Sequence, residues 1–465
     1  MDERERDGAN GKVDVGRSTR RRTMVDRRGV LKGVAGAGLA LGLGSRLGGV
    51  STAQTPIAFS KDYAGTTLNM LMEDLSETTI IEGLLPDFKD KTGVDVQFEK
   101  VNYNVMHEKL VPQLAAGAGN GSYDALEVDF YWVYEFARSG WVEELGPRIE
   151  ASNGQVDLAR YIPATLKINS EVDGKTYYIP MYPYPMGLLY RNDLMDDADF
   201  KAAYKTVAGK DLALPDSVDG YVELAKNISK MDKGIYGAAM QAAQPDPIVM
   251  EFCNFLYGMG GDYYDEGLTK PIINDPTGVK ALTAYVDCVQ NAAQPGAAGA
   301  DLNDTMATYL QAKAFSMISY VLFMLNNFQN DPTSKVKGKS GIATMPGGKG
   351  LTGAWSWGIP ISSPNPDAAW EYIKWVESPD IAMKRAIAGG VPSQLAPYDN
   401  AEFLQKYPWM KDAKDLIANG KGLPAVTKQT QLVEIMGRHL SDAVSGGASP
   451  QDAMNAAADE LKGLL

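Results

Sequence analysis

Hydrophobic residues early in the chain switch between strand spacing and helix spacing. Thr67–Leu71 predicts a short buried strand, and apolar residues at helical spacing follow it in a helix that we expect Ser76 to cap and Gly93 to end. Residues 94–99 then alternate apolar and polar side chains, which is the period of a strand. One strand–helix–strand unit results, with parallel pairing and a right-handed crossover.

The alternation continues over the next forty or so residues. The pattern predicts a helix over 105–116, a strand over 125–128 and a helix over 133–138. Open α/β sheets bind ligands beyond the carboxyl ends of their strands. Two loops leave such ends, 73–76 and 129–132, and both carry carboxylates, so we expect the binding site there.

A proline-rich segment follows. Residues 180–185 contain three prolines, which block a continuous helix, with Tyr182 and Tyr184 between them. The segment is either a stiff surface loop with core tyrosines or a strand crossing between two lobes that presents its rings to a cleft. Residues 353–360 read as a second extended crossing.

The second half of the chain is richer in helical patterns. Helices are expected to dominate from 216 to 322, including one capped by the Asn274-Asp275-Pro276 turn. An amphipathic helix is predicted over 368–375, and a final helix over 450–465. Strands and helices alternating in this way indicate an α/β fold.

The first 53 residues have the organisation of an export signal. The Arg27-Arg28 pair precedes a short apolar run at 33–43, and small residues at 51–53 suit a signal peptidase. The segment resembles a twin-arginine signal, which implies the twin-arginine export machinery as a partner and cleavage near Ala53. The protein is then periplasmic or extracellular. The alternative is an uncleaved N-terminal anchor, although the apolar run is short for a bilayer span.

Composition narrows the class of partner. The whole chain has 465 residues and a formal net charge of −13, and 45% of its residues are apolar. The predicted signal carries 11 basic and 6 acidic residues, so its removal would leave 412 residues with a net charge of −18. Such a charge argues against nucleic acid and anionic membranes as partners. The length suits two to three domains.

Cysteine and histidine are scarce. Cys253 and Cys288 are the two cysteines, and the sequence leaves open whether they form a disulfide or pack as buried thiols. His107 and His439 lie far apart without ligands at metal spacing. We therefore expect no metal site, no cofactor and no histidine-based catalytic residues.

Several stretches in order resemble one family over about 66–440. The stretches are 84–96, the Asp-plus-aromatic segment 123–141, the strand segment 187–194, the Gly-Gly-Asp hairpin 260–265 and the Pro-rich turn and helix at 358–373. Together they are similar to the extracellular solute-binding proteins of ABC importers, family 1, the maltose-binding-like group that includes many sugar and polyol binders.

The resemblance implies a two-lobed periplasmic-binding-protein fold of type II. Each lobe is a sheet flanked by helices, and three hinge crossings join the lobes. The N-terminal lobe would comprise 55–184 and 357–395, and the C-terminal lobe 187–354 and 396–465. A ligand between the lobes stabilises their closed form, and the closed form delivers it to the membrane permease. The implied protein is a monomer that binds a small carbohydrate and is not an enzyme.

Positions that match the family's ligand-facing segments combine carboxylates, amides and aromatic rings. Rings cover the C–H faces of a sugar, and polar groups hold its hydroxyls. Any one ring here has core packing as its alternative, and the two acids that follow the first strand have helix capping as theirs. The candidate residues are Glu73, Asp74, Asp129, Trp132, Tyr182, Tyr184, Gln241, Gln244, Asp246, Tyr320, Phe323, Trp355 and Trp357.

Basic residues are scarce among these positions, and Gln394 stands where relatives often carry one. This disfavours a phosphate or carboxylate ligand, which Arg usually holds. A neutral sugar or polyol is expected first, and a cation such as a polyamine is the alternative. A secreted glycoside-active enzyme and an envelope adhesion protein are further alternatives from other classes.

Overall fold

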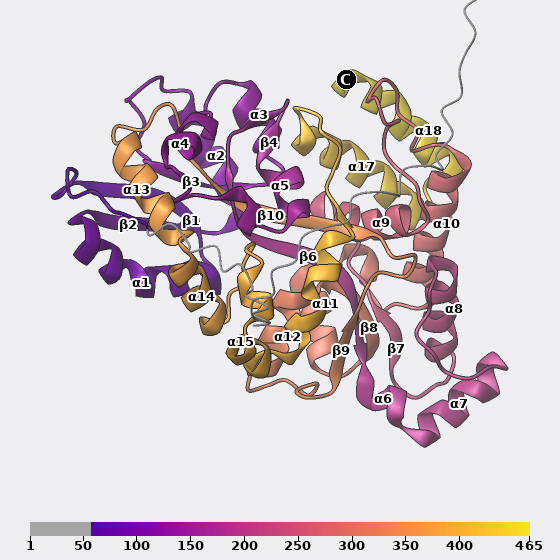
Figure 1. Ribbon diagram of the computed structural model, residues 1–465. Helices are drawn as coiled ribbons and strands as arrows, with labels where there is room; N and C mark the ends of the chain where they lie inside the picture. Colours follow the sequence, from indigo (N-terminus) through magenta and orange to yellow (C-terminus); the bar gives the residue numbers. More distant parts are fainter. Residues whose placement is uncertain (1–56) are drawn as a thin grey trace, which may run out of the picture. The chain divides into compact units, whose positions relative to one another are not determined.

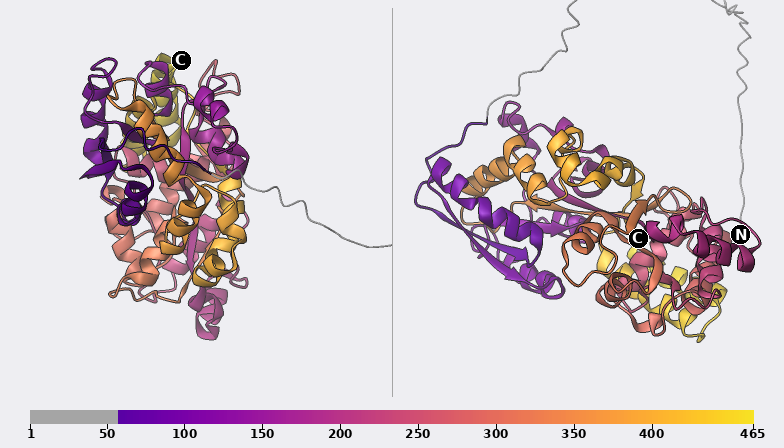
Figure 2. Two further views of the ribbon diagram at one scale, coloured as in Figure 1. Left: turned by 60° about the vertical axis from the view of Figure 1, so that its left-hand side comes forward. Right: turned by 90° about the horizontal axis from the view of Figure 1, so that it is seen from below.

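One long strand, β6 (Ile179–Arg191), joins two groups of strands in the computed structural model, which describes residues 57–465 (Figure 1). The predicted export signal, 1–53, lies outside the described residues. In the right-hand view of Figure 2, the indigo elements of the first sheet lie at one end and the pink and yellow helices at the other.

The first sheet has the strand order β2-β1-β3-β10-β6. Strand β1 (Thr67–Glu73) pairs in parallel with β2 (Asp95–Val101) and with β3 (Ala125–Asp129). Strand β10 (Gly350–Gly358) runs antiparallel between β3 and β6. The predicted parallel strand–helix–strand unit is therefore confirmed, and β1 and β3 end side by side.

The second sheet begins where β6 changes its neighbours. Residues 179–185 pair with β10, whereas residues 186–191 pair with β8 (Ala314–Tyr320) and β9 (Ser340–Ala343). Strand β7 (Tyr236–Ala239) lies parallel to β8. Both β7 and β8 fall inside 216–322, where helices were predicted to dominate. Nearly every residue of these strands is buried, so they lack the polar alternation that would reveal a strand.

Helices cover both sheets, and α1, α13 and α14 flank the first one in Figure 1. Short strands complete the set: β4 (Glu171–Val172) and β5 (Lys175–Thr176) form a hairpin, and β11 (Gly420–Lys421) pairs in parallel with the start of β10. The helices are α1 (Ser76–Thr92), α2 (Tyr103–Leu114), α3 (Val133–Arg138), α4 (Gly146–Ala151), α5 (Pro163–Asn169), α6 (Asn192–Asp196), α7 (Ala198–Ala208), α8 (Val218–Ser229), α9 (Asp246–Gly258), α10 (Pro276–Asn291), α11 (Leu302–Leu310), α12 (Val321–Asn330), α13 (Pro366–Val376), α14 (Pro379–Ala388), α15 (Ala401–Lys406), α16 (Ala413–Ala418), α17 (Gln429–Val444) and α18 (Pro450–Leu461).

Helix ends follow the local sequence in most places. Gly93 ends α1 in the left-handed region at φ 77°, as predicted, because glycine has no side chain to oppose it. Asp275 caps α10 by accepting a hydrogen bond from the Gly278 amide, also as predicted. Ser76 does not cap α1: it is the first helical residue, and Leu75 occupies the cap without a side-chain bond.

The prolines of β6 lie where the sheet tolerates them. Over residues 179–185 this strand has β10 on one side, and on the other it pairs with no strand of residues 57–465. Proline lacks an amide hydrogen, so it fits a strand with an open side. The proline-rich segment is thus a strand rather than a surface loop.

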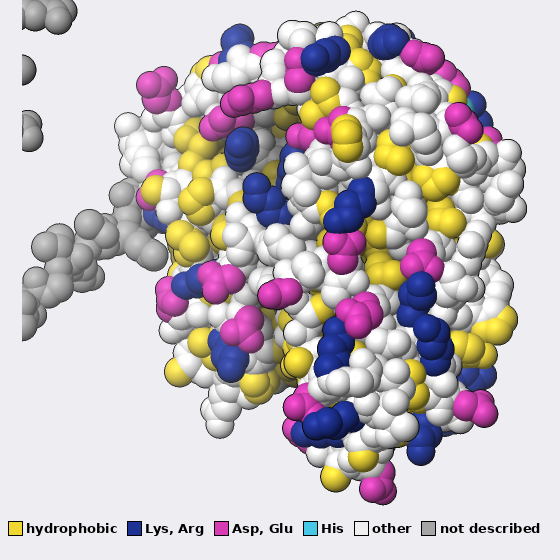
Figure 3. Space-filling view, turned by 90° about the vertical axis from the view of Figure 1, so that its right-hand side faces the viewer, with side chains coloured by type: hydrophobic (Ala, Val, Ile, Leu, Met, Phe, Trp, Pro, Cys, Tyr) yellow, Lys and Arg dark blue, Asp and Glu magenta, His cyan; other side chains and the backbone are white. Residues whose placement is uncertain are grey.

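Charges of both signs alternate over the outer helices. Figure 3 shows basic and acidic side chains next to one another on the side of the molecule that lies at the right in Figure 1. On α8 and α10, Lys226 pairs with Asp287 and Asp219 pairs with Lys280. Within 57–465, no helix is both long enough and apolar enough to cross a bilayer.

Candidate ligand-binding site

Asp129, the last residue of β3, is the centre of a polar and aromatic cluster. Its carboxylate is 2% exposed and accepts hydrogen bonds from the hydroxyls of Tyr103 (2.7 Å) and Tyr184. Burial raises the pKa of Asp129 to about 7, and the two tyrosine hydrogen bonds oppose that rise. The end of β3 therefore holds a carboxylate close to its titration point at neutral pH.

Aromatic rings surround this carboxylate. Tyr103 stacks on Trp132 with ring centroids 5.8 Å apart, and Trp355 meets both rings edge to face. Tyr182 and Tyr184 contribute from β6, with Tyr182 6.5 Å from Trp355. Rings in this arrangement present flat apolar surfaces next to a hydrogen-bonding group, which suits a ligand with C–H faces and hydroxyls.

Two further carboxylates lie beside Asp129. Glu73 ends β1, and Glu127 is two residues before Asp129 on the same face of β3. One Glu127 oxygen accepts the amide of Glu73 at 2.7 Å, and the other has no partner among the described residues. Burial and then the charge of Asp129 raise the pKa of Glu73 to about 8. Burial and then the charge of Glu73 hold the pKa of Glu127 well above its usual range.

The other half of the molecule approaches the cluster through α9 and β8. Tyr131 donates its hydroxyl to the carboxylate of Asp246, the first residue of α9, at 2.7 Å. Burial raises the pKa of Asp246, and the Tyr131 hydrogen bond opposes that rise. Tyr320, at the end of β8, meets Tyr184 edge to face at 5.4 Å. The structure thus brings predicted residues from both halves together around Asp129.

Other predicted residues stand apart from this cluster. Asp74 and Gln244 are exposed, and Phe323 packs on the hydrophobic cluster around β8 and α12. Gln241 is buried just after β7, with its amide bonded to Glu251 and its side-chain oxygen unpaired within the described chain.

Trp357 also lies apart from the rings around Asp129. It is fully buried, meets Tyr372 of α13 edge to face and donates its indole hydrogen to Glu377 at 2.8 Å. It sits opposite Glu127 in the sheet, whereas Trp355 sits opposite Asp129. The two tryptophans share one face of β10, but α13 covers Trp357.

A buried ion network lies behind this part of the sheet. Arg385 of α14 bonds to Glu77 (2.8 Å) and Glu377 (2.6 Å), and it also donates to the Met181 carbonyl of β6. Gln394 donates its side-chain amide to the backbone of Glu377 at 2.7 Å. Gln394 therefore supports the network.

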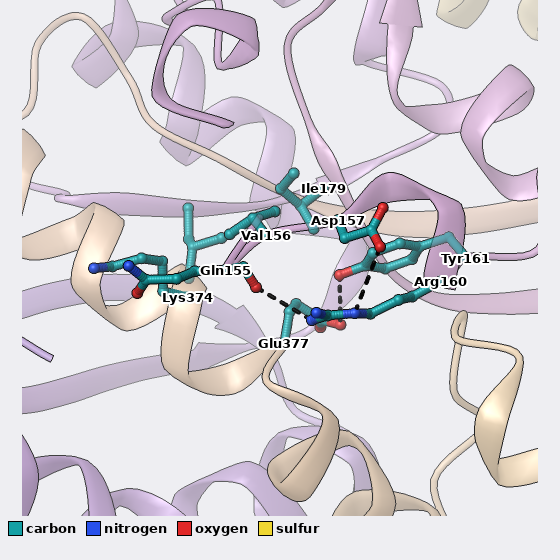
Figure 4. A pocket seen from close by; sticks show the side chains of 9 residues that line it. Gln155, Val156, Asp157, Arg160, Tyr161, Ile179, Lys374 and Glu377 are labelled. Atoms are coloured by element: carbon teal, nitrogen blue, oxygen red, sulfur yellow. Dashed lines mark hydrogen bonds and ion pairs between the residues drawn. The ribbon is translucent and has the colours of Figure 1, made fainter. Parts of the chain in front are cut away.

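Two hollows lie outside the cluster. A small cavity of about 10 Å³ is bordered by Gln155, Arg160, Tyr161 and Glu377 (Figure 4), with room for about one water molecule. An open groove between α8 and α10 is lined by charged and small side chains without an aromatic ring. Neither has the mixture of rings and carboxylates found around Asp129.

Sequence reasoning missed Tyr103, Glu127 and Tyr131. Glu127 was within reach, because residues two apart in a predicted strand share a face and Asp129 was already a candidate. Tyr131 lies in the 129–132 loop, where the site was expected, although it was not named as a candidate. Tyr103 reaches the cluster from the start of α2, and no local pattern predicts that. The sequence left open whether the two cysteines form a disulfide. In the structure, Cys253 and Cys288 are both buried, free thiols.

The sequence profile of bacterial extracellular solute-binding proteins matches residues 74–383. The chain belongs to this family. Among curated relatives, a probable amino-acid ABC transporter periplasmic-binding protein of Sinorhizobium fredii is 25% identical over 429 residues, which are 91% of this chain and 94% of that protein. An erythritol/L-threitol-binding protein of Mycolicibacterium smegmatis is 23% identical over 353 residues, 70% of each protein.

Solved structures agree with this family at the level of the fold. A solute-binding protein of an ABC transporter from Agrobacterium radiobacter K84, in complex with ribitol, has a TM-score of 0.74 and 24% identity over 86% of this chain and 99% of its own. MalE3 of T. maritima with bound maltose has a TM-score of 0.73 and 26% identity over 86% of this chain and all of its own. The expected type II, two-lobed binding-protein fold is confirmed.

Proposed function

We propose that this solute-binding protein captures a sugar, oligosaccharide or polyol and delivers it to the membrane permease of an ABC importer. The observation that carries the proposal is the buried Asp129 carboxylate, set among the rings of Tyr103, Trp132, Tyr184 and Trp355 at the end of β3. Rings cover the C–H faces of a sugar, while carboxylates orient its hydroxyls.

The relatives support this ligand class. Related structures contain ribitol, D-mannitol and maltose, and one curated relative is named for erythritol and L-threitol. Another is named as an amino-acid binder. An amino acid is the weaker candidate here, because its carboxylate needs a basic partner and Arg385 is already paired with two glutamates.

Capture is proposed to follow closure of two lobes, 55–184 with 357–395 and 187–354 with 396–465. The neighbours of β6 change between Pro185 and Met186, which supports a hinge there. A ligand that contacts Asp129 from one lobe and Asp246 or Tyr320 from the other favours the closed form through its greater affinity for that form.

The proposed site consists of a polar and aromatic core with a surrounding rim. Trp357 is left out because α13 covers it. Asp74, Gln244, Gln241 and Phe323 form the proposed rim, and the core residues are Glu73, Tyr103, Glu127, Asp129, Tyr131, Trp132, Tyr182, Tyr184, Asp246, Tyr320 and Trp355.

Export completes the proposal. Removal of 1–53 by the twin-arginine route would release a monomeric binding protein on the outer side of the cytoplasmic membrane, where the permease receives its ligand. The protein is proposed to bind without chemical turnover.

The test begins with the ligand that copurifies with the protein, released by denaturation and identified by mass spectrometry. Thermal melting with ribitol, D-mannitol, erythritol and maltose follows, with recovery of each compound measured after incubation. A polyol or sugar that raises the melting temperature and is recovered intact supports the proposal. Chemical conversion of the compound, or an unchanged melting temperature with every sugar and polyol, contradicts it.

A further inference from the structure

Three carboxylates converge at the carboxyl ends of β1 and β3. Glu73 ends β1, while Glu127 and Asp129 share one face of the adjacent strand β3. Burial, and then the charge of Asp129, raises the pKa of Glu73, while burial and then the charge of Glu73 raise the pKa of Glu127, so ionisation of one acid disfavours ionisation of its neighbour. Asp246 adds a fourth carboxylate from α9, and its charge adds to the effect of burial in raising the pKa of Asp129.

These acids have no basic partner in the described part of the chain. No Lys or Arg between 57 and 465 forms an ion pair with Glu73, Glu127, Asp129 or Asp246, and the groups that face them are tyrosines. The neighbouring acid Glu77 behaves differently, because Arg385 neutralises it. Glu77 and Glu377 thus share a buried cation, whereas the acids around Asp129 have none among the described residues.

Two buried polar atoms at the same place also lack partners. One oxygen of Glu127, which is 0% exposed, and the hydroxyl of Tyr182, which is 9% exposed, have no hydrogen bond within the described residues. Burial, and then the charges of Glu127 and Glu73, hold the pKa of the Tyr182 hydroxyl well above its usual range. A buried acceptor beside a buried hydroxyl leaves two hydrogen bonds for an incoming group.

We propose that the ligand is a polyhydroxylated amine, whose ammonium group contacts Glu73 and Glu127 while its hydroxyls reach Asp129 and its C–H faces lie on Trp132 and Trp355. This inference rests on the proposed function and specifies its ligand class. An ammonium group donates three hydrogen bonds and stabilises the ionised forms of Glu73 and Glu127, whereas a neutral polyol supplies no charge to offset their raised pKa values. Tryptophan faces add attraction for a cation.

Isothermal titration calorimetry with matched pairs tests this inference. The pairs are D-glucitol against 1-amino-1-deoxy-D-glucitol and D-glucose against D-glucosamine, each at pH 6.0 and pH 7.5 in two buffers of different ionisation enthalpy. We expect at least one amine to bind about tenfold tighter than its neutral partner at pH 7.5. We also expect protons to be released at pH 6.0, because the cation favours ionised Glu73 and Glu127.

Variants assign the preference to its residues. Glu127→Gln should abolish the preference for the amine over its neutral partner, and Glu73→Gln should reduce that preference. Glu108→Gln removes the same charge from an exposed position of α2 and should leave both affinities unchanged. Thermal melting confirms that each variant is folded.

Three results would overturn the inference. If the neutral compounds bind as tightly as the matching amines, the inference is wrong and the proposed function stands. If none of the four compounds binds, the inference is also wrong, and thermal melting with ribitol, D-mannitol, erythritol and maltose decides the proposed function separately. Retention of the amine preference by both folded Gln variants would show that these acids do not hold the ammonium group.

Discussion

The hydroxyl of Tyr131 lies 2.7 Å from a carboxylate oxygen of Asp246, although 115 positions separate the two residues in the chain. Tyr131 belongs to the loop after β3, and Asp246 begins α9 beside the second sheet. The bond therefore ties the two halves of the molecule together next to the proposed site.

Loss of this bond should favour the open form. Removing the hydroxyl in Tyr131→Phe costs about 1 kcal/mol of contact between the halves, so ligand affinity should fall about fivefold. The radius of gyration of the unliganded protein, measured by small-angle X-ray scattering, should increase. Tyr264→Phe is the control, since the Tyr264 hydroxyl bonds to the Leu461 carbonyl away from the site. An unchanged radius and affinity in Tyr131→Phe would contradict the role of this bond.

Asp129 and Trp132 should be required for ligand binding. We expect Asp129→Asn to weaken binding at least tenfold, because a charged hydrogen bond to a ligand hydroxyl is worth about 1.5–3 kcal/mol. Trp132→Ala should abolish the ligand-induced rise in melting temperature by removing the central ring. Normal circular dichroism together with a parent-like thermal shift in both variants would show that the site lies elsewhere.

Trp357 offers a contrast with Trp132. Trp357→Phe removes the indole hydrogen bond to Glu377 and leaves a small void, so the melting temperature of the free protein should fall. The ligand-induced shift should nevertheless remain. A lost shift in this variant would return Trp357 to the binding site.

The free protein should become less stable as the pH rises from about 4.5 to about 8. Folding raises the pKa of Glu73 to about 8 and that of Asp129 to about 7. At a pH between the unfolded and the folded pKa of either group, the folded state binds more protons than the unfolded state. The free energy of unfolding then falls with pH, by at most about 1.4 kcal/mol per unit for each proton.

Urea denaturation at pH 5, 6.5 and 8 measures this slope. In the double variant Glu73→Gln/Asp129→Asn the slope should be clearly shallower than in the parent, because neither side chain titrates. A parent stability that rises over this range, or a double variant with the parent's slope, would contradict the assignment.

The buried Arg385 should be more important for stability than an exposed arginine. Arg385→Met leaves Glu77 and Glu377 without their cation, and breaking such a pair costs about 3–5 kcal/mol. Arg438→Met, which removes an exposed pair with Glu460, should cost less than about 1 kcal/mol. Urea midpoints of the two variants give the comparison, and equal losses would count against a structural role for the network.

Much of the first sheet could be predicted because its signals are local. The β1–α1–β2 unit follows from spacing within thirty-odd residues, and Gly93 ends α1 where its backbone freedom is needed. Strands β7 and β8 could not be predicted in this way, since buried strands have no polar face to set the period.

The candidate site shows the same limit. Asp129 was predicted from its place at a strand end, but its partners Tyr103 and Tyr184 come from separate elements. Trp355 and Trp357 were both predicted as site residues, yet the sequence does not reveal that α13 covers Trp357. Such cover depends on how distant elements pack, which periodicity does not encode.

Strand β6 is both a wall of the proposed site and the connection between the two sheets. Tyr182 and Tyr184 lie only a few residues before Met186, where the strand leaves one sheet for the other. A substitution of either tyrosine that changes ligand specificity would therefore also change the segment about which the two halves are proposed to move. Specificity and domain motion are thus expected to evolve together.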